Sequence, residues 1–247
     1  MKRFKNQLII TTMNIRNAFK NLLTPIVIIL GLSSCLNDND GAPIQPFAFV
    51  SIYHGAPETA SLDVFANSSK VTNSPFRFTE TLPYLRYYLG QRTFKFSPYN
   101  SVTTLLEDTF TIEDNKVYSI FLTGLPNDLE AIIVEDSWGS FNQNQTKIRF
   151  VHLSPDAGEV EILLDNEETS KFENNEFKSH SNFEALEAKS YNIKVVSKET
   201  GETLITANNV ELKRNRAYSL ILRGLESEQT DVNKQLNLQL ITNFINY

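Results

Sequence analysis

Residues 52–57 are Ile52-Tyr53-His54-Gly55-Ala56-Pro57, and residues 150–155 repeat the pattern as Phe150-Val151-His152-Leu153-Ser154-Pro155. Each stretch is an apolar segment that ends in a histidine and a proline-containing turn. The offset between them is 98 positions, from residue 52 to residue 150. A pattern that recurs at a fixed spacing is typical of repeated structural units, so the chain is predicted to contain two copies of one domain.

Further segments recur at nearly the same offset, which extends the repeat over the whole unit. They are residues 62–65 with 160–163, residues 90–96 with 188–194, and residues 117–125 with 217–225. We interpret the chain as a tandem duplication, with a first domain over 47–137, a linker over 138–146 and a second domain over 147–247. In the linker, Trp138 and Phe141 are expected to hold the two domains together.

Short alternating segments separated by turn residues are typical of all-β sandwiches. Seven such segments over about 95 residues fit an immunoglobulin-like or transthyretin-like antiparallel β-sandwich in each copy. Only residues 183–188 show a weak helical period. The predicted strands are 48–54, 61–67, 77–82, 91–97, 104–112, 117–124 and 129–136 in the first copy, and 147–153, 159–165, 175–182, 189–197, 203–212, 217–224 and 235–244 in the second.

The histidine–proline turn, the acidic residue in the next strand and the late Tyr-Ser strand resemble the domain-of-unknown-function 4397 family. The second copy matches more closely, with His152, Ser154, Pro155 and Asp156, whereas the first copy departs at Gly55-Ala56-Pro57-Glu58. Domains of this family occur, often in tandem, in exported bacterial proteins and are predicted β-sandwiches. The resemblance covers nearly all of 48–245 and implies a fold, but it implies no activity or catalytic residue.

The first 35 residues resemble a bacterial lipoprotein signal. Five basic and no acidic residues precede a short apolar run over 22–32, and Leu32-Ser33-Ser34-Cys35 forms a lipobox. The apolar run is shorter than the roughly 20 residues that a membrane-spanning helix needs. A positive start, a short apolar middle and small residues at the cleavage site describe a secretory signal instead. Residues 1–34 are the predicted signal peptide, with Met13 as an alternative start.

The resemblance to lipoproteins implies that Cys35, the only cysteine, is diacylated and becomes the first residue of the mature chain. Each buried methylene adds about 0.8 kcal/mol, and more than one acyl chain is needed for a stable anchor. Residues 35–46 are predicted to form a flexible tether. We therefore expect an exported, lipid-anchored protein at the outer membrane, facing either the periplasm or the cell surface. A non-lipidated export signal is the alternative.

The charge balance excludes one class of partners. All 29 acidic residues but only 18 of the 23 basic residues follow Ser34, so the mature chain carries a net charge of −11. Nucleic-acid binding needs a basic footprint, so no nucleic-acid partner is expected. Because the anchor uses Cys35, no thiol is left for a disulfide, a cysteine nucleophile or a thiolate metal site, and no cofactor is predicted.

His54 and His152 stand at equivalent places in the two copies. Strand alternation puts both on the core face, so each is expected to be structural and to bond a backbone group of the turn at Pro57 or Pro155. Metal sites need several convergent ligands, and neither motif has a second histidine or a cysteine nearby. No metal site is therefore predicted. His180 has no counterpart in the first copy and is expected at the surface.

Asp63 and Glu161 are equivalent and alternate with apolar neighbours, which predicts outward, solvated carboxylates. A glycosidase would need two carboxylates within about 10 Å, and a serine hydrolase would need a motif such as G-x-S-x-G. Neither is indicated, so no catalytic residue is predicted and we expect a protein that is not an enzyme. Tyr118 and Tyr218 open the penultimate strands, where a tyrosine corner would bond its hydroxyl to upstream backbone.

Tyr84, Tyr87 and Tyr88 form an aromatic cluster that the second copy replaces with residues 183–186. Because duplicated domains share their core, a feature of one copy alone is a better functional candidate than a shared one. Exposed rings here could stack on a sugar or a peptide, with half-buried strand-edge packing as the alternative. We expect a non-enzymatic, membrane-tethered envelope module for binding, adhesion or assembly with an unknown protein or glycan partner. The alternative is a carbohydrate-binding accessory lipoprotein that uses these tyrosines.

Overall fold

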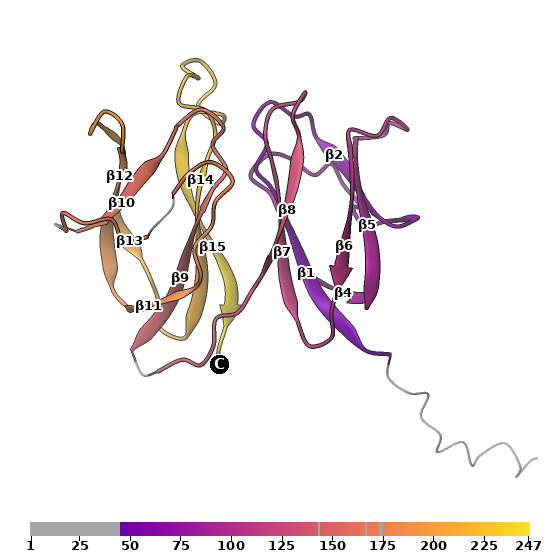
Figure 1. Cartoon of the computed structure of the whole chain (residues 1–247), viewed down its shortest axis with the longest axis horizontal. Helices are drawn as coiled ribbons and strands as arrows, with labels where there is room; N and C mark the ends of the chain where they lie inside the picture. Colours follow the sequence, from indigo (N-terminus) through magenta and orange to yellow (C-terminus); the bar gives the residue numbers. More distant parts are fainter. Residues whose placement is uncertain (1–44, 143, 166, 173–174) are drawn as a thin grey trace, which may run out of the picture. The chain divides into compact units, whose positions relative to one another are not determined.

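Strands make up the regular structure of this chain. The computed structural model describes residues 45–142, 144–165, 167–172 and 175–247, and in these ranges it contains fifteen strands and no helix. The all-β prediction is confirmed. The strands form four sheets, which pack as two face-to-face pairs that we refer to as the first and second sheet pairs (Figure 1).

The first sheet pair is built from residues 47–135. One sheet has the order β4-β1-β7-β8, and the other has the order β3-β2-β5-β6. Their inner faces enclose a core that includes Val50, Ile52, Leu62, Phe94 and Phe96. The strand bounds are β1 Phe47–His54, β2 Leu62–Ala66, β3 Ser69–Lys70, β4 Thr81–Tyr88, β5 Gly90–Pro98, β6 Leu106–Ile112, β7 Val117–Thr123 and β8 Glu130–Glu135.

The second sheet pair is built from residues 145–245. Its sheets have the orders β11-β9-β14-β15 and β10-β12-β13. The core between them includes Ile148, Phe150, Ile162, Ile193 and Leu220. The strand bounds are β9 Gln145–His152, β10 Val160–Leu164, β11 Glu184–Glu187, β12 Ser190–Ser197, β13 Thr203–Glu211, β14 Arg216–Arg223 and β15 Asn237–Ile245.

The same connectivity recurs in the two sheet pairs. Most neighbouring strands are antiparallel, but β1 pairs with β7 in parallel, and β9 pairs with β14 in parallel. The registers correspond: Val50 stands opposite Tyr118, and Ile148 stands opposite Tyr218. This recurrence supports the duplication that we infer from the sequence.

Three predicted segments differ from the structure. Residues 77–82 were expected to form a strand, but β4 begins only at Thr81 and runs to Tyr88. Residues 175–182 contain no named strand, and the weak helical pattern over 183–188 is instead strand β11. Both β4 and β11 are edge strands that pair with β1 and β9, so tertiary pairing overrides their weak local patterns.

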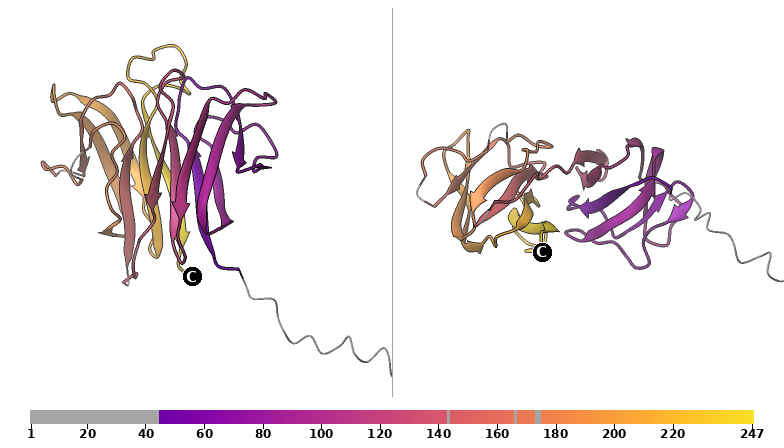
Figure 2. Two further views of the ribbon diagram at one scale, coloured as in Figure 1. Left: turned by 45° about the vertical axis from the view of Figure 1, so that its right-hand side comes forward. Right: turned by 90° about the horizontal axis from the view of Figure 1, so that it is seen from below.

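Strands β1 and β7 of the first sheet pair, and β9 and β14 of the second, are buried on both faces. From the fourth residue onward, every residue of β1 and of β9 is buried, which is the pattern of strands covered on two sides. Their outer faces meet in a third apolar cluster that joins the two sheet pairs and contains Tyr53, Phe121, Val134, Val151, Leu153 and Ile221. The facing sheets are visible in Figure 2.

Gly55 is required by this close approach. A Cβ at residue 55 would lie 2.6 Å from Leu153 Cδ1 and 2.9 Å from the carbonyl oxygen of Leu122. Leu153 is the residue that stands at the equivalent place in the second copy. The absence of a side chain at Gly55 therefore leaves room for Leu153 of the second sheet pair.

Candidate binding sites

The three tyrosines of the predicted aromatic cluster do not act together. Tyr84 is directed into the boundary between the sheet pairs, where its hydroxyl donates to Asp136 Oδ2 at 2.5 Å and accepts from Asn243 Nδ2 at 2.9 Å. Burial, and next the charge of Asp136, raise the pKa of Tyr84 above its ordinary value. Tyr84 is therefore part of the internal packing of the molecule.

Tyr87 and Tyr88 remain beside each other on β4 but face different surroundings. The Tyr87 ring packs against Phe94 of the first core at 5.3 Å, and burial raises its pKa to about 12. Tyr88 is 63% exposed. Since successive residues of a strand point to opposite faces, only Tyr88 presents its ring to solvent.

Both residues line an open groove of about 490 Å³. Its wall contains three basic side chains, Lys70, Arg86 and Arg92, and no acidic residue. Lys70 is paired with Asp63 at 2.8 Å, whereas neither arginine makes an ion pair within the described ranges. We refer to this feature as the Tyr88 groove. It stands out because the chain as a whole is acidic.

A buried charge network at the boundary between the sheet pairs escaped the sequence analysis. The side chain of Arg149 is 1% exposed and pairs with the fully buried Asp136 at 2.5 Å. Its Nε donates to Ser219 Oγ at 2.7 Å, and its Nη2 donates to Ser119 Oγ at 3.1 Å. The sequence does contain a signal for this network: the residue equivalent to Arg149 in the first copy is Ser51. A charged residue therefore stands at this position in one copy only.

The two histidines are buried, as predicted, but they differ in their partners. His152 Nε2 lies 2.9 Å from the carbonyl oxygen of Gly158, and its Nδ1 accepts from the backbone of Ser154 at 3.3 Å. The predicted bond to the following turn is thus confirmed for His152. Within the described residues, neither ring nitrogen of His54 has a hydrogen-bond partner. Its ring packs against Phe76 at 5.4 Å.

Burial lowers the pKa of both histidines to about 4. Each ring is therefore neutral at physiological pH, which suits a packed core residue. His180 lies on the exposed surface as predicted. Among the described residues, no three His, Cys, Asp or Glu side chains gather as a metal site would require.

The prediction of a solvated Asp63 is wrong. Its side chain is 4% exposed, and it accepts hydrogen bonds from the backbone of Asn100 at 3.0 Å and from Thr72 Oγ1 at 3.4 Å. Burial opposes ionisation, but the hydrogen bonds and the charge of Lys70 outweigh it and lower the pKa. The outward face of β2 is covered by its neighbouring loops, which alternation alone does not show. Glu161 is half-buried.

Tyr118 and Tyr218 form the expected corners. The backbone nitrogen of Glu113 donates to the Tyr118 hydroxyl at 3.4 Å, and that of Lys213 donates to the Tyr218 hydroxyl at 3.2 Å. Both tyrosines are structural. The linker aromatics Trp138 and Phe141 both stack on Phe244, at 4.8 Å and 6.0 Å. These contacts hold the linker to the second sheet pair and, contrary to expectation, do not bridge the two sheet pairs.

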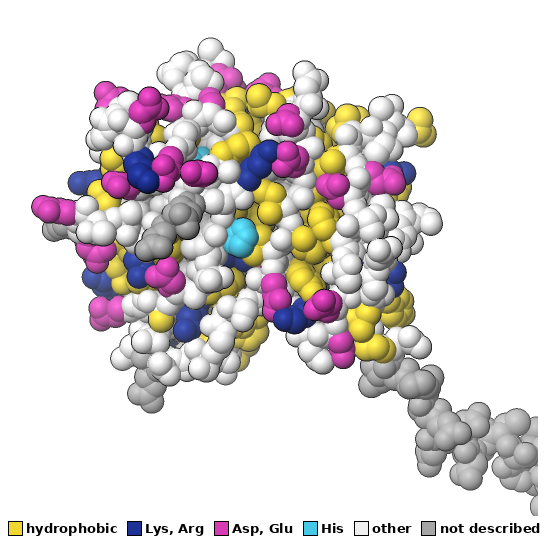
Figure 3. All heavy atoms as spheres, in the orientation of Figure 1, with side chains coloured by type: hydrophobic (Ala, Val, Ile, Leu, Met, Phe, Trp, Pro, Cys, Tyr) yellow, Lys and Arg dark blue, Asp and Glu magenta, His cyan; other side chains and the backbone are white. Residues whose placement is uncertain are grey.

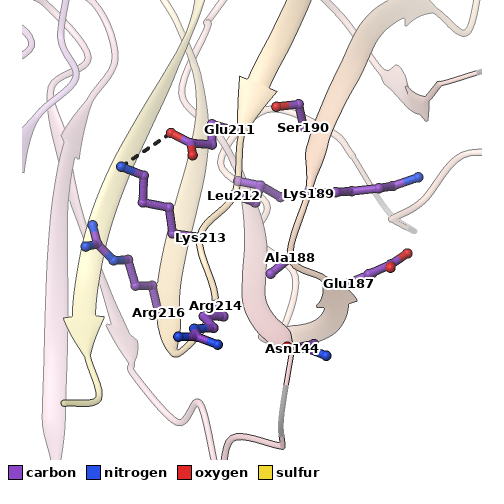
Figure 4. A pocket seen from close by; sticks show the side chains of 10 residues that line it. All are labelled: Asn144, Glu187, Ala188, Lys189, Ser190, Glu211, Leu212, Lys213, Arg214 and Arg216. Atoms are coloured by element: carbon purple, nitrogen blue, oxygen red, sulfur yellow. Dashed lines mark ion pairs between the residues drawn. The ribbon is translucent and has the colours of Figure 1, made fainter.

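A further pocket of about 660 Å³ lies between the turns at residues 187–190 and 211–216 (Figure 4). Lys213 points toward Glu211, with which it pairs at 3.3 Å, whereas Lys189 extends to the opposite side and pairs with Asp165 at 3.1 Å. Its charged groups therefore diverge instead of converging on one ligand. In the view of Figure 3, basic and acidic side chains are interspersed over the surface.

Cys35, the predicted lipidation site, lies outside the described residues. In the part of the chain that the structure describes, no helix has the length and apolarity needed to cross a membrane.

Residues 48–163 match the model of the family described as "Domain of unknown function (DUF4397)". The match covers the first sheet pair and continues through β9 into β10. No curated protein matches the chain. Among solved structures, the chain is similar to one titled "Alpha-glucan binding by a streptococcal virulence factor", with 7% identity, 74% of this chain and 95% of that chain covered, and a TM-score of 0.25. A likeness at that TM-score supports no argument about function.

Proposed function

We propose that this protein is a non-enzymatic, membrane-tethered lipoprotein of the cell envelope that acts as a binding, adhesion or assembly module. The observation that carries the proposal is the Tyr88 groove, where an exposed aromatic ring on the edge strand β4 lies beside basic side chains. Concave sites with a few convergent polar groups are the usual form of binding sites. The lipobox ending at Cys35 supports export and attachment to the outer membrane. The anchored domain then faces either the periplasm or the cell surface.

A carbohydrate-binding accessory lipoprotein is the second candidate. The observation that favours it is the 63% exposure of Tyr88, because an exposed flat ring offers an apolar face and a polar hydroxyl at one place. Tyr88 alone supplies the aromatic platform, since Tyr84 is bonded at the internal boundary and Tyr87 packs against Phe94 of the core. Arg86 and Arg92 favour a glycan that carries acidic groups.

Substitution of Tyr88 tests the binding role of the groove. The purified mature chain is applied to a panel of neutral and acidic glycans, and the Tyr88→Ala variant is compared with it. We expect binding to an acidic glycan and at least a tenfold loss of affinity in Tyr88→Ala, because the exposed ring is removed without disturbing the core. Tyr247→Ala, a matched exposed tyrosine at the C-terminus, should bind as the wild type does. Equal affinity in Tyr88→Ala and the wild type would reject the groove as the glycan site.

Substitution of Cys35 tests the anchor. In cells that export the protein, Cys35→Ala removes the sulfur that acylation needs, so the protein should move from the membrane fraction to the soluble fraction. Fractionation and immunoblotting measure this shift, with Cys35→Ser as a second variant that also lacks the thiol. Membrane retention of both variants would show that acylation of Cys35 is not the anchor.

A further inference from the structure

A separate pocket of about 360 Å³ lies where the two sheet pairs meet. Its walls come from residues 57–61 and 77–79 of the first sheet pair and from residues 223–234 of the second. Two contacts hold the walls together: Lys234 pairs with Glu58 at 3.1 Å, and Gln239 Nε2 donates to the carbonyl oxygen of Thr79 at 3.1 Å. The pocket therefore exists only because the two sheet pairs are joined. Interfaces between separately packed cores, like those between domains, are preferred places for small-ligand sites.

The basic side chains of this pocket are not equally neutralised. Arg77 pairs with Glu80 at 3.4 Å, and Lys234 pairs with Glu58. Arg223 has no carboxylate within 4.0 Å among the described residues; its Nη1 donates to the carbonyl oxygen of Asn233 at 2.8 Å.

The acidic residue of the lining does not compensate Arg223. Asp231 accepts from the backbone of Asn233 at 3.0 Å and from its side chain at 3.3 Å. Burial lowers the pKa of Arg223, which is the direction expected for a cation that lacks a close counter-ion. A half-buried cation of this kind is costly unless an anion lies beside it.

Two buried polar side-chain atoms without partners, Thr59 Oγ1 and Arg223 Nε, belong to residues that line this pocket. Buried polar groups in folded proteins are nearly always hydrogen-bonded, so each exception needs an explanation. Among the described residues, buried side-chain nitrogen or oxygen atoms without a hydrogen-bond partner occur in His54, Thr59, Arg223, Asp136 and Arg149. Those of Asp136 and Arg149 form an ion pair with each other. Thr59 and Arg223 line the pocket, and His54 packs against the lining residue Phe78 at 6.3 Å.

We propose that this pocket binds a small oxyanion, a carboxylate or a phosphate carried on a body no larger than a monosaccharide. Arg223 supplies the counter-charge, and Phe78, whose ring lies 5.5 Å from the Arg223 guanidinium carbon, provides an apolar wall for the body of the ligand. The volume suits one such molecule, because small-ligand pockets begin at about 300 Å³. This site is distinct from the Tyr88 groove and does not depend on it.

Titration calorimetry of the mature chain with glucuronate, inorganic phosphate and glucose tests the proposal. Saturable binding of glucuronate or of phosphate is expected, and the anion that binds identifies which oxyanion the site prefers. Glucose, which lacks a charge, should not bind. Absence of binding by both anions would overturn the proposal.

Variants assign the binding to Arg223. Arg223→Gln should lower the affinity at least tenfold, and Arg223→Lys, which keeps the charge but loses the planar donor group, should lower it less. Arg214→Gln, an exposed cation of the other pocket, and Tyr88→Ala should bind as the wild type does. Thermal unfolding in buffer verifies that each variant is folded, and Thr59→Val replaces Arg223→Gln if that variant is unfolded. An affinity within twofold of the wild type in folded Arg223→Gln, or in Thr59→Val when it takes that place, would overturn the assignment.

Discussion

At the scale of single residues, His54 and His152 occupy equivalent positions in the two copies but differ in their hydrogen bonds. The partner of His152 is the carbonyl of Gly158, which has a φ of 65°. The equivalent residue in the first copy is Ala60, and a side chain with a Cβ rarely adopts that left-handed conformation. Ala60 is not among the residues with a positive φ, and although its backbone acts to raise the pKa of His54, the imidazole has no hydrogen bond of good geometry and packs between the rings of Phe76 and Phe78.

The buried histidines make stability depend on pH. Their pKa is about 4 in the folded protein and 6.5 in the unfolded chain, so the unfolded chain binds more protons between these values. The free energy of unfolding should thus be highest above pH 6.5 and fall as the pH drops toward 4, by up to about 3 kcal/mol for each histidine. Urea unfolding at pH 7.5 and pH 4.5 measures this loss.

His54→Phe isolates the contribution of one histidine. The variant cannot take up the proton at residue 54, so between the two pH values it should lose less stability than the wild type, by up to about 3 kcal/mol, while His152 and His180, whose pKa burial also lowers, still contribute. Asp63 and Asp156 contribute little to the stability loss between pH 7.5 and pH 4.5, because hydrogen bonds outweigh burial and lower their pKa. Their stabilisation is lost only below about pH 4, the ordinary carboxyl range. An unchanged loss in His54→Phe would contradict the assignment of the pH dependence to His54.

At the scale of strands, the sequence predicted most elements because alternation and turn residues agree there. The strands around Val50, Phe94 and Ile120 form close to their predicted bounds, since each places its apolar residues on one core. The edge strands β4 and β11 were harder to predict. Their residues are only half-buried on the inner side, so pairing with β1 and β9 decides their structure, and pairing is not visible in a local pattern.

The same reasoning explains which site residues could be predicted. The corner tyrosines and the buried histidines follow from strand position alone. Asp63 and Tyr84 could not be placed, because each is buried by segments distant in sequence: the loop at Asn100 covers Asp63, and Asn243 of β15 contacts Tyr84. The pocket at Arg223 is built by residues from both sheet pairs, so it has no local signature.

At the scale of the whole molecule, residues 46–247 form one compact unit. The two sheet pairs are joined by an apolar cluster and by the Arg149–Asp136 pair within it. Breaking a buried ion pair by removing one partner costs about 3–5 kcal/mol, because the remaining charge stays buried without compensation. The two sheet pairs are therefore expected to stabilise each other and to unfold in one cooperative transition.

Differential scanning calorimetry of residues 46–247 tests this coupling most directly. The wild type should show a single transition with a calorimetric enthalpy equal to the van't Hoff enthalpy. Arg149→Met, which removes the cationic partner of Asp136 and leaves it the hydrogen bonds from Tyr84 and Ser119, should lower the midpoint and separate the transition into two. Arg214→Met, a surface control, should stay within about 0.5 kcal/mol of the wild type. Two separate transitions in the wild type, or an unchanged single transition in Arg149→Met, would contradict the coupling of the two sheet pairs.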